Sequence, residues 1–430
     1  MVSVRGVTAE PVPVTPDQPD SVDPVTAILA AGRGAEPALL ARKYATMRQT
    51  PFSFMRGTCH LFFATLPRIA ALEAAPRTWL SGDLHAENFG AYKGDNRLTY
   101  FDVTDFDESA LGPPTLDAVR FLASILVATG EWGLDAAEGD ALVARAAVAY
   151  ATELASGKAA WIERETARGA MKRLLAQVAG RSRSDLLARF TTRKAKRRRF
   201  VLDDRHLYAA TDAERSAVEA MLVSIGEQAH DPEYFRVVDV ARRAVGVGSL
   251  GRPRFAVLVE GRGSPDRNAL VELKAAHPSA TAPRLATPQP AWRDDAERVV
   301  TVQRHAVVVA PAFLSTARSD DVGFIFRELQ LSDDRLRLRD WERQPRKLAE
   351  AIVTLAAVAA WMHLRAGAWR ESASVDALAA FGAEHEWRGA LVDAAREAAA
   401  RTLLQYQAFC AAYDRGELAV PSGEGGPGAH

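Results

Sequence analysis

Apolar residues switch from a helical spacing to a strand-like spacing and back again, and this alternation constrains the fold most. Ala and Leu recur at helical spacing over 37–80 and 115–190, and helical spacing returns from residue 346. Five strand-like runs lie between these blocks: 234–244, 255–260, 269–275, 306–314 and 322–329. A helix is expected at 294–305, inside this segment. The pattern predicts an α+β fold in which a β-rich segment interrupts a helical block.

The same pattern divides the chain into five segments. The first is expected to be a flexible arm because it holds five prolines, and the last is rich in Gly and Pro and is expected to fray. The two helical segments are predicted to form one lobe around the β-rich one. The segments are the arm at 1–36, helices at 37–200, the β-rich lobe at 201–335, returning helices at 336–420 and a tail at 421–430.

Composition excludes several classes of chain, but the neutral total conceals an uneven distribution of charge. The 430 residues hold 54 Lys or Arg and 54 Asp or Glu, 48% are hydrophobic and 25% are charged. These values are typical of a folded protein and exclude disordered, collagen-like and histone-like chains. Residues 81–117 hold eight acids and two bases, whereas residues 181–199 hold nine bases and one acid. The first region suits a metal site and the second attracts anions.

Cysteine usage and hydropathy favour a soluble, cytoplasmic protein. The two cysteines, Cys59 and Cys410, are too few for a disulfide framework or a Cys-rich zinc site, so reduced thiols are expected. The N-terminal residues lack a basic region followed by an apolar core, so no targeting signal is expected. The longest apolar stretch, 351–364, is interpreted as too short to cross a bilayer, and no membrane partner is expected.

Residues 81–108 carry the strongest chemical signal. Asp83 and Asn88 lie five positions apart in the string Ser-Gly-Asp-Leu-His-Ala-Glu-Asn, which opens a strand–turn–strand pattern. Asp102 and Asp105 close that pattern in the string Asp-Val-Thr-Asp-Phe-Asp-Glu. Carboxylates and a carboxamide on adjoining loops are hard oxygen ligands that suit magnesium and phosphoryl transfer. The alternative is an acidic turn in which Asp and Asn side chains cap the loop backbone.

These motifs resemble two groups of proteins. The strings Arg-Gly at 56–57, Gly-Asp-x-His-x-x-Asn-Phe-Gly at 82–90 and Asp-Phe-Asp-Glu at 105–108 resemble an uncharacterised bacterial family, domain of unknown function 2252. That resemblance covers most of 37–380. The shorter Gly-Asp-Leu-His…Asn motif is similar to the catalytic loop of aminoglycoside phosphotransferases and of the wider protein-kinase-like fold.

The kinase-like resemblance implies roles for individual residues. Asp83 would be the catalytic base, and Asn88 would be a magnesium ligand. The second metal ligand stays open, because spacing from Asn88 favours Asp102 whereas the local string favours Asp105, which we slightly prefer. Asp117 resembles the Asp at a helix start that holds the catalytic-loop backbone through hydrogen bonds. The alternative for Asp117 is an ordinary carboxylate that the helix dipole favours.

Two more residues are given supporting roles. His85 lies inside the catalytic-loop motif. Arg56 follows an aromatic run and is expected to pack under the catalytic loop, where it either reaches an anion or only contributes to packing. The other histidines show no spacing typical of a zinc site.

A glycine-rich string at 246–251 offers a second place for phosphates. Gly246, Gly248 and Gly251 follow the spacing G-x-G-x-x-G, with Ser249 between them. A dinucleotide-binding turn needs a helix after it, but the following residues, 252–260, form a strand-like run. A kinase-type glycine loop joins two antiparallel strands and covers the phosphates, which suits this pattern. A flexible hairpin turn is the remaining alternative.

The next strand adds a candidate phosphate-binding lysine. Residues 269–274 end in the pattern V-x-x-K, and the resemblance implies that Lys274 contacts the α- and β-phosphates. Glu297, on the helix expected at 294–305, is the candidate partner of Lys274. The alternatives are a surface strand lysine for Lys274 and a solvated helix charge for Glu297.

The order of the motifs is unusual for a kinase-like chain. Protein kinases have the glycine loop and lysine before the catalytic loop, whereas here Asp83 precedes Gly246 and Lys274. No second Gly-Asp-x-His-x-x-Asn string follows the β-rich segment. The sequence therefore predicts a circularly permuted, two-lobed kinase-like fold, in which the contacts are kept although the chain order differs.

The expected function is an ATP- and magnesium-dependent phosphotransferase acting on a hydroxyl of a small molecule or a protein. One alternative is a nucleotide-binding pseudokinase that serves as a scaffold, and another is a nucleotidyl transferase on the same fold. The basic run at 181–199 is interpreted as a connector, with binding of an anionic substrate or nucleic acid as the alternative. Its few aromatic residues weaken a single-strand nucleic-acid interpretation.

Overall fold

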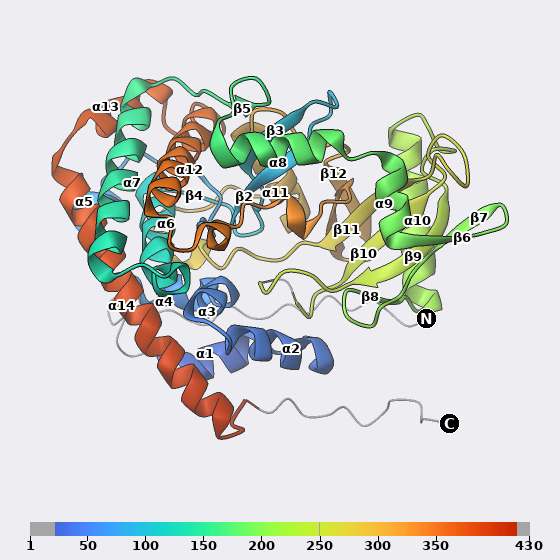
Figure 1. The fold of residues 1–430 in the computed structure, drawn as a ribbon, viewed down its shortest axis with the longest axis horizontal. Helices are drawn as coiled ribbons and strands as arrows, with labels where there is room; N and C mark the ends of the chain where they lie inside the picture. The colour runs from blue at the N-terminus through green and yellow to red at the C-terminus, as the bar shows by residue number, and fades with distance from the viewer. Residues whose placement is uncertain (1–21, 249, 419–430) are drawn as a thin grey trace.

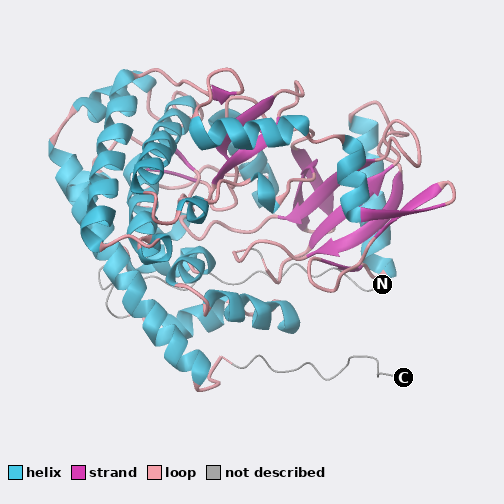
Figure 2. Cartoon of the chain, in the orientation of Figure 1, coloured by secondary structure: helices cyan, strands magenta, loops and turns pink. Residues whose placement is uncertain are grey.

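The structure, a computed structural model, describes residues 22–248 and 250–418. It confirms the mixed α+β class. Figure 1 shows most strands gathered on one side of the molecule and the long helices on the other, and Figure 2 separates the two kinds of element by colour. The predicted tail at 421–430, Ser249 of the glycine-rich string and most of the predicted arm lie outside the described residues.

One antiparallel sheet of six strands dominates the β-rich segment. Its order is β12-β13-β11-β10-β9-β8. The strands are β8 (Leu207–Ala209), β9 (Val237–Arg243), β10 (Arg254–Val259), β11 (Ala269–Ala275), β12 (Ser315–Ser319) and β13 (Val322–Glu328). Helices α10 (Asp212–Gln228) and α11 (Asp295–Ala306) belong to the same stretch of chain. The glycine-rich string joins β9 to β10, and these two strands pair antiparallel.

Side chains alternate between the two faces of this sheet, as the pleat requires. Val271 and Leu273 of β11 pack into a cluster with apolar residues of α10. Leu270 belongs to a different cluster, so it points to the opposite face. Glu272 and Lys274 share the face of Leu270, which places two charged side chains inside the molecule rather than in solvent.

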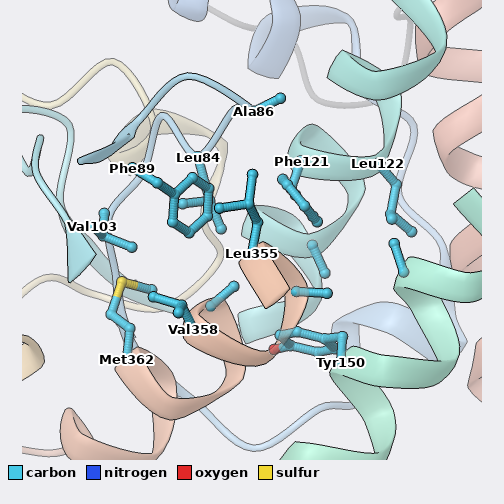
Figure 3. Close-up of a cluster of buried hydrophobic side chains, with 14 of the residues drawn as sticks. Leu84, Ala86, Phe89, Val103, Phe121, Leu122, Tyr150, Leu355, Val358 and Met362 are labelled. Atoms are coloured by element: carbon cyan, nitrogen blue, oxygen red, sulfur yellow. The ribbon is translucent and has the colours of Figure 1, made fainter. Parts of the chain in front are cut away.

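The helical part of the molecule is built around four long helices that share a core. They are α6 (Pro114–Ala128), α7 (Ala136–Ser156), α12 (Pro345–Arg365) and α14 (Glu386–Asp414). Figure 3 shows Phe121 from α6, Tyr150 from α7 and Leu355 from α12 packed beside Leu84 of the catalytic-loop string. The motif therefore rests on the helical core rather than on a free surface loop.

Helix α12 corrects the expectation that the longest apolar stretch is too short for a membrane span. It has 21 residues and is apolar enough to cross a bilayer, but 72% of its most apolar window is buried inside the protein. Burial explains its apolar character, because a core helix needs nonpolar residues on most of its surface. Its packing is consistent with a soluble protein.

The N-terminal segment corrects the expected boundary of the flexible arm at residue 36. Residues Pro24–Ala31 form α1, whose first turn is capped by Asp23 through a 2.7 Å bond from the Thr26 amide. Ile28 is buried in a cluster with Phe409 of α14. The proline that suggested disorder lies at the start of the helix, where its fixed φ favours helix formation.

Smaller elements connect these parts. The short helices are α2 (Pro37–Met47), α3 (Pro51–Gly57), α4 (Cys59–Thr65), α5 (Ala70–Glu73), α8 (Gly169–Gly180), α9 (Arg183–Phe190) and α13 (Val375–Ala383). The short strands are β1 (Thr78–Leu80), β2 (Phe89–Lys93), β3 (Thr99–Val103), β4 (Ala110–Gly112), β5 (Ile162–Glu163), β6 (Thr191–Lys194) and β7 (Arg197–Phe200). β2 and β3 form the strand–turn–strand unit expected after the catalytic-loop motif.

The predicted strand at 306–314 is absent, because β12 begins only at Ser315. The apolar run instead follows the β2–β3 hairpin as a loop. The Val308 amide donates to Asp102 at 3.2 Å, and the Val309 carbonyl accepts from Tyr92 at 2.9 Å. The run is apolar because it is buried at this junction, so its composition could not distinguish it from a strand.

Truncation of Leu355 tests the importance of the shared core. Leu355 is fully buried, so Leu355→Ala should lower the free energy of unfolding by about 2–5 kcal/mol. Val353, on the same helix, is 37% exposed, and Val353→Ala is the control, with an expected change within about 0.5 kcal/mol. Urea unfolding followed by circular dichroism measures both, and equal effects would contradict the assigned core.

Candidate functional site

The loop that carries Asp83 is fixed by a buried carboxylate. Asp117 of α6 accepts hydrogen bonds from the backbone amides of Ser81, at 2.8 Å, and Gly82, at 3.0 Å. Its third contact, at 3.2 Å, is with Nε2 of His363 from α12. The structure thus gives Asp117 the backbone-holding geometry considered for it, in addition to its place in the first turn of α6.

Gly82 is required by both backbone conformation and space. Its φ is +83°, in the left-handed region that favours glycine. A Cβ at this position would lie 1.8 Å from the carbonyl oxygen of Glu108. The loop after β1 and the acidic loop after β3 therefore approach each other at the backbone level, which brings their side chains into one site.

Asp83 is paired with Arg120, a fully buried arginine of α6. Nε of Arg120 donates to Oδ1 of Asp83 at 2.6 Å, and its terminal nitrogen donates to the Met55 carbonyl at 3.0 Å. The Asp83 side chain is 21% exposed, and it points into a cavity. Burial raises the pKa of Asp83 to about 6, although Arg120 favours the charged form.

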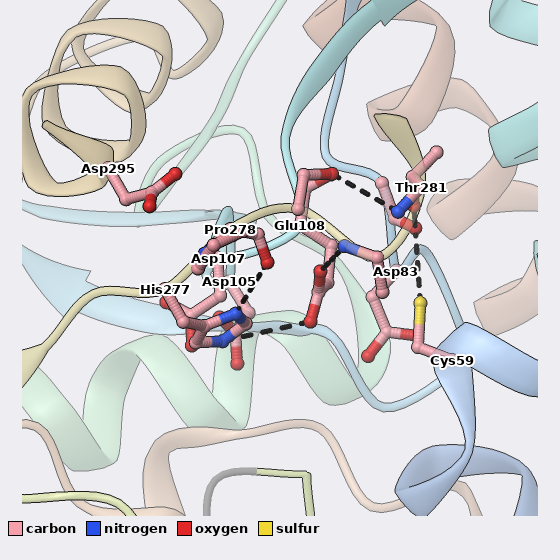
Figure 4. Close-up of polar contacts among 12 residues, drawn as sticks. Cys59, Asp83, Asp105, Asp107, Glu108, His277, Pro278, Thr281 and Asp295 are labelled. Atoms are coloured by element: carbon pink, nitrogen blue, oxygen red, sulfur yellow. Dashed lines mark hydrogen bonds and ion pairs between the residues drawn. The ribbon is translucent and has the colours of Figure 1, made fainter. Parts of the chain in front are cut away.

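Asn88 and the acidic loop are held beside Asp83. The Asn88 side-chain amide donates to the carbonyl of Asp83, so its oxygen stays available as a ligand. The Asn88 carbonyl accepts from the amide of Thr104 at 2.9 Å. Asp105 follows Thr104 and lines the same cavity as Asp83 and Asn88. Figure 4 shows Asp83 and Asp105 on adjoining loops.

The structure separates the two candidates for the second metal ligand. Asp102 is 1% exposed, and Arg365 binds both of its carboxylate oxygens at 3.0 and 2.7 Å. It does not line the cavity. Asp105 does, so the geometry places Asp105 rather than Asp102 among the groups that can reach a ligand. Spacing from Asn88 favoured Asp102 only because it does not show which way a strand residue points.

Lys274 reaches this acidic loop from the sheet. Its Nζ lies 3.6 Å from Asp105 and forms an ion pair with Asp107. The carboxylate pKa of Asp105 is held below its usual value by Lys274 and Arg335, against the opposing effect of burial. Gly246, Gly248 and Gly251 of the glycine-rich string line the same cavity as Lys274.

Glu297 is not the partner of Lys274. It accepts a hydrogen bond from the Arg293 amide at 2.7 Å, and its own amide bonds to Asp294, so it serves the start of α11. The neighbouring Arg298 is a charged residue of α11 whose side chain is buried. Arg298 donates to the carbonyls of Asp107, at 3.0 Å, and His277, at 2.7 Å. The predicted Lys274–Glu297 pair is therefore absent from the structure.

The cavity has a volume of about 270 Å³. Helices α1 and α2 form part of its wall, together with the glycine-rich string and the acidic loop. Lys43 of α2 and Arg252 after the string add positive charge. Burial, with a further contribution from Arg252, lowers the pKa of Lys43 to about 8. The cavity lining thus combines four carboxylates, Asp83, Asp105, Asp107 and Glu108, with a larger number of Lys and Arg side chains.

The two supporting residues have different surroundings. Arg56 donates to Glu87 at 2.7 Å and lines the cavity, so it faces a ligand space. His85 is buried and its ring contacts Phe52 edge-on, with centroids 5.7 Å apart. Burial lowers the pKa of His85 well below its usual value, so the ring is neutral, and it also lines the cavity.

The donor set suits a magnesium ion that is shared with a ligand. Within the described residues, no group of three or more His, Cys, Asp or Glu side chains is arranged to hold a metal alone. Asn88 and Asp105 offer one amide oxygen and one carboxylate. Magnesium commonly takes one or two protein carboxylates and completes its shell with phosphates and water. The residues present therefore fit a magnesium–phosphate complex better than a metal cage made only of protein.

Much of the basic run at 181–199 is neutralised by ion pairs. Arg181 binds Asp334 through two bonds of 2.9 and 2.6 Å. Asp266 pairs with two further arginines of the run, and Asp239 with another. β6 and β7 form a hairpin, and the Phe200 amide bonds to Asp239 of β9 at 2.8 Å. The run therefore docks against the sheet, whereas the sequence pattern placed it with the helical segment.

Comparison with known proteins assigns a family. The profile of an uncharacterised protein family conserved in bacteria, DUF2252, matches residues 35–412. This match covers most of the chain. The chain belongs to the DUF2252 family. No curated protein and no solved structure matched this DUF2252 protein.

Several residues of the DUF2252 site were not found by sequence reasoning, among them Arg120, Lys43 and Arg252. Arg120 lies three positions after Asp117 on α6, and its apolar neighbours suggested only a core helix. Lys43 lies on a helix that the motifs did not connect with the site, and Arg252 lies in a short linker. A signal existed for Arg120 alone, because an arginine inside a strongly apolar helix needs a buried partner.

Replacement of Gly82 tests the loop geometry. Gly82→Ala introduces a Cβ that would contact the Glu108 carbonyl and strain the backbone. We expect a loss of stability of at least about 1–3 kcal/mol and weaker binding of any ligand of the cavity. Gly130→Ala is the matched control, because no atom lies within 4 Å of its Cβ position. Thermal unfolding of both variants measures the effect, and an unchanged Gly82→Ala protein would contradict the close approach.

Proposed function

We propose that this DUF2252 protein is an ATP- and magnesium-dependent phosphotransferase that acts on a hydroxyl of a small molecule or a protein. One observation carries the proposal. Lys274, from the β-rich segment, lies in one cavity with Asp83, Asn88 and Asp105, which come from loops much earlier in the chain. Phosphoryl transfer needs these residue types around one ligand: a base, oxygen ligands for magnesium and a lysine for phosphates.

We further propose a circularly permuted kinase-like fold. The β-rich segment supplies two strands joined by the glycine-rich string, then the lysine strand, a helix and two more strands. Kinase-like proteins place this unit before the catalytic loop, whereas here it follows Asp83. The ion pair of Lys274 with Asp107 supports the permutation, because it joins the late segment to the early loops. The absent Lys274–Glu297 pair is the main departure from the kinase pattern.

Each residue has a role in the proposed reaction. Asp83 would accept the proton of the acceptor hydroxyl, because it lines the cavity and burial raises its pKa to about 6. Asn88 and Asp105 would hold magnesium, which supplies charge neutralisation at the phosphates. Lys274 and the glycine-rich string would position the phosphates. Arg120 would keep Asp83 in place, since Arg120 is buried and its Nε donates a hydrogen bond to Oδ1 of Asp83.

A second candidate is a nucleotide-binding scaffold without turnover. It is favoured by the contacts of Lys274, which pairs with Asp107 instead of a helix glutamate. Thermal shift with ATP and magnesium, followed by a screen of acceptors, separates the two functions. Stabilisation without product favours the scaffold. The mass of any product also decides whether one phosphate or one nucleoside monophosphate is transferred, which tests the nucleotidyl-transferase alternative.

Removal of the proposed base tests the assignment of Asp83. Asp83→Asn keeps the shape and the hydrogen-bond acceptor for Arg120 but cannot take a proton at neutral pH. We expect phosphoryl transfer to fall by about 10²–10⁴-fold while ATP binding is retained. Asp321→Asn is the matched control, because the Asp321 side chain is fully exposed. Transfer of labelled phosphate and calorimetric ATP binding measure both, and full activity of Asp83→Asn would reject the role.

The raised pKa of Asp83 predicts a pH dependence. Because the base must be deprotonated, activity should be low below the pKa and should rise as the pH increases through about 6. The measurement is the rate of transfer at saturating ATP between about pH 5 and 8. The residual activity of Asp83→Asn should lack this transition. A wild-type profile that stays flat across pH 6 would contradict Asp83 as the base.

A further inference from the structure

A second cavity, of about 340 Å³, lies beside the first. It is bounded by the inward face of the six-stranded sheet, by the glycine-rich string and by residues 330–337 after β13. Its volume is near the lower end of that of small-molecule sites, about 300–1,000 Å³. Its lining holds many more basic than acidic side chains. The arginines in it are Arg42, Arg56, Arg243, Arg254, Arg327, Arg335 and Arg337, and the acids are Glu87 and Asp334.

The arginines of the sheet surround one carboxylate. Glu272 is fully buried, and Arg254 and Arg327 contact it at 2.6 and 2.8 Å. Arg243 forms a third ion pair with the same side chain. Together with Arg335 we call Arg243, Arg254 and Arg327 the arginine cluster. The pKa of Glu272 is held below its usual value by these arginines, against burial, so the carboxylate is charged.

The arginine cluster holds more positive charge than its partners neutralise. Within the described residues, Glu272 is the carboxylate paired with the three sheet arginines, and Asp105 is the carboxylate near Arg335, at 3.4 Å. Four guanidinium groups therefore face two carboxylates, one of which Lys274 also approaches. Burial lowers the pKa of Arg243 to about 10, which still leaves it charged at neutral pH.

Uncompensated buried charge is unfavourable unless a counter-ion binds. Guanidinium groups match the oxygens of phosphate in paired hydrogen bonds and are less strongly hydrated than ammonium groups. A phosphate group, or a chain of phosphates, supplies the missing negative charge with the correct geometry. A surplus of two positive charges favours a multiply charged anion over a single carboxylate.

The two cavities share part of their lining. Both are lined by Arg56, Gly246, Val247, Leu250, Arg254 and Arg335. Arg335 lines both cavities, and its terminal nitrogen lies 3.4 Å from the Asp105 carboxylate. A ligand that contacts Arg335 in the second cavity would therefore lie close to Asp105. The arginine cluster thus lies next to the proposed reacting groups. Its sheet arginines come from β9, β10 and β13, strands that lie on both sides of β11, which carries Lys274.

We propose that the arginine cluster is a binding subsite for phosphate groups, preferably an oligophosphate. This inference goes beyond the proposed function, because it requires anion binding but no transfer. The phosphates belong either to the nucleotide itself or to a phosphorylated acceptor, and the experiment below distinguishes these sources. In either case the second cavity would hold the most negative part of a ligand.

The test is calorimetric titration of the full chain with inorganic tripolyphosphate, without magnesium. We expect binding to the wild type, and a dissociation constant at least about tenfold higher for Arg335→Gln. Arg335 is the best position, because its side-chain ion pair is limited to one contact of 3.4 Å. Arg339→Gln is the charge-matched control, since Arg339 is exposed and lines neither cavity.

A second variant distinguishes a specific loss of binding from a loss of structure. Glu272→Gln removes the negative charge inside the cluster, so it should strengthen tripolyphosphate binding while Arg335→Gln weakens it. Loss of structure cannot cause opposite changes. Absence of binding to the wild type would overturn the proposal. So would binding that Arg335→Gln leaves unchanged and that Lys43→Gln abolishes, because the anion would then occupy the first cavity.

Competition identifies the source of the phosphates. If ATP displaces tripolyphosphate competitively, the nucleotide's own phosphates occupy the subsite. If ATP and tripolyphosphate bind together, the subsite belongs to a phosphorylated acceptor. Both results support the subsite. Tripolyphosphate binding in a protein that transfers nothing to any acceptor would retain this inference and reject the proposed function, so the two fail independently.

Discussion

The buried carboxylate of Asp117 is the interaction on which the site depends. It joins the loop after β1 to α6 through two backbone amides and to α12 through His363, whose other ring nitrogen lies 2.8 Å from the Tyr150 hydroxyl of α7. A buried charge is costly unless hydrogen bonds satisfy it, and here two amides and a ring nitrogen do so. Because the partners come from different elements, the catalytic-loop string can adopt its shape only when these elements are assembled.

A second constraint acts where the sheet meets the helical part. Arg298 ties α11 to the carbonyls of the acidic loop and of His277, while Lys274 pairs with Asp107 from the same loop. Charged hydrogen bonds are directional, so they fix the distance between the two parts more closely than apolar contacts do. The acidic loop is therefore positioned from both sides. This explains how residues far apart in sequence form one cavity.

The sequence predicted the α+β class and most elements, because the spacing of hydrophobic residues was regular within them and glycines marked the turns between them. The resemblance to kinase-like motifs also singled out Asp83, Asn88, Asp105 and Lys274, and these residues line one cavity. The prediction from sequence was wrong about the strand at 306–314 and about residues 24–31, which form α1. Both errors have one cause: apolar or proline-rich composition does not reveal whether a segment packs on other parts of the chain. The predicted Lys274–Glu297 pair was wrong for a similar reason. Tertiary packing decides which side of α11 faces inward, and the sequence does not show it.

The arginine cluster shows why some site residues stay invisible in a sequence. Glu272 of β11 lies directly opposite Arg327 of β13, and Lys274 of β11 lies opposite Arg254 of β10. These pairs arise from the register between neighbouring strands of the sheet, and a shift by one residue would turn every one of these side chains to the α10 face. A glutamate in an apolar strand looks like a solvent-facing position until its neighbours are known. Once the register is fixed, the period of two places Glu272 and Lys274 on the same face. Lys274 then lines the first cavity, while the arginines around Glu272 line the second.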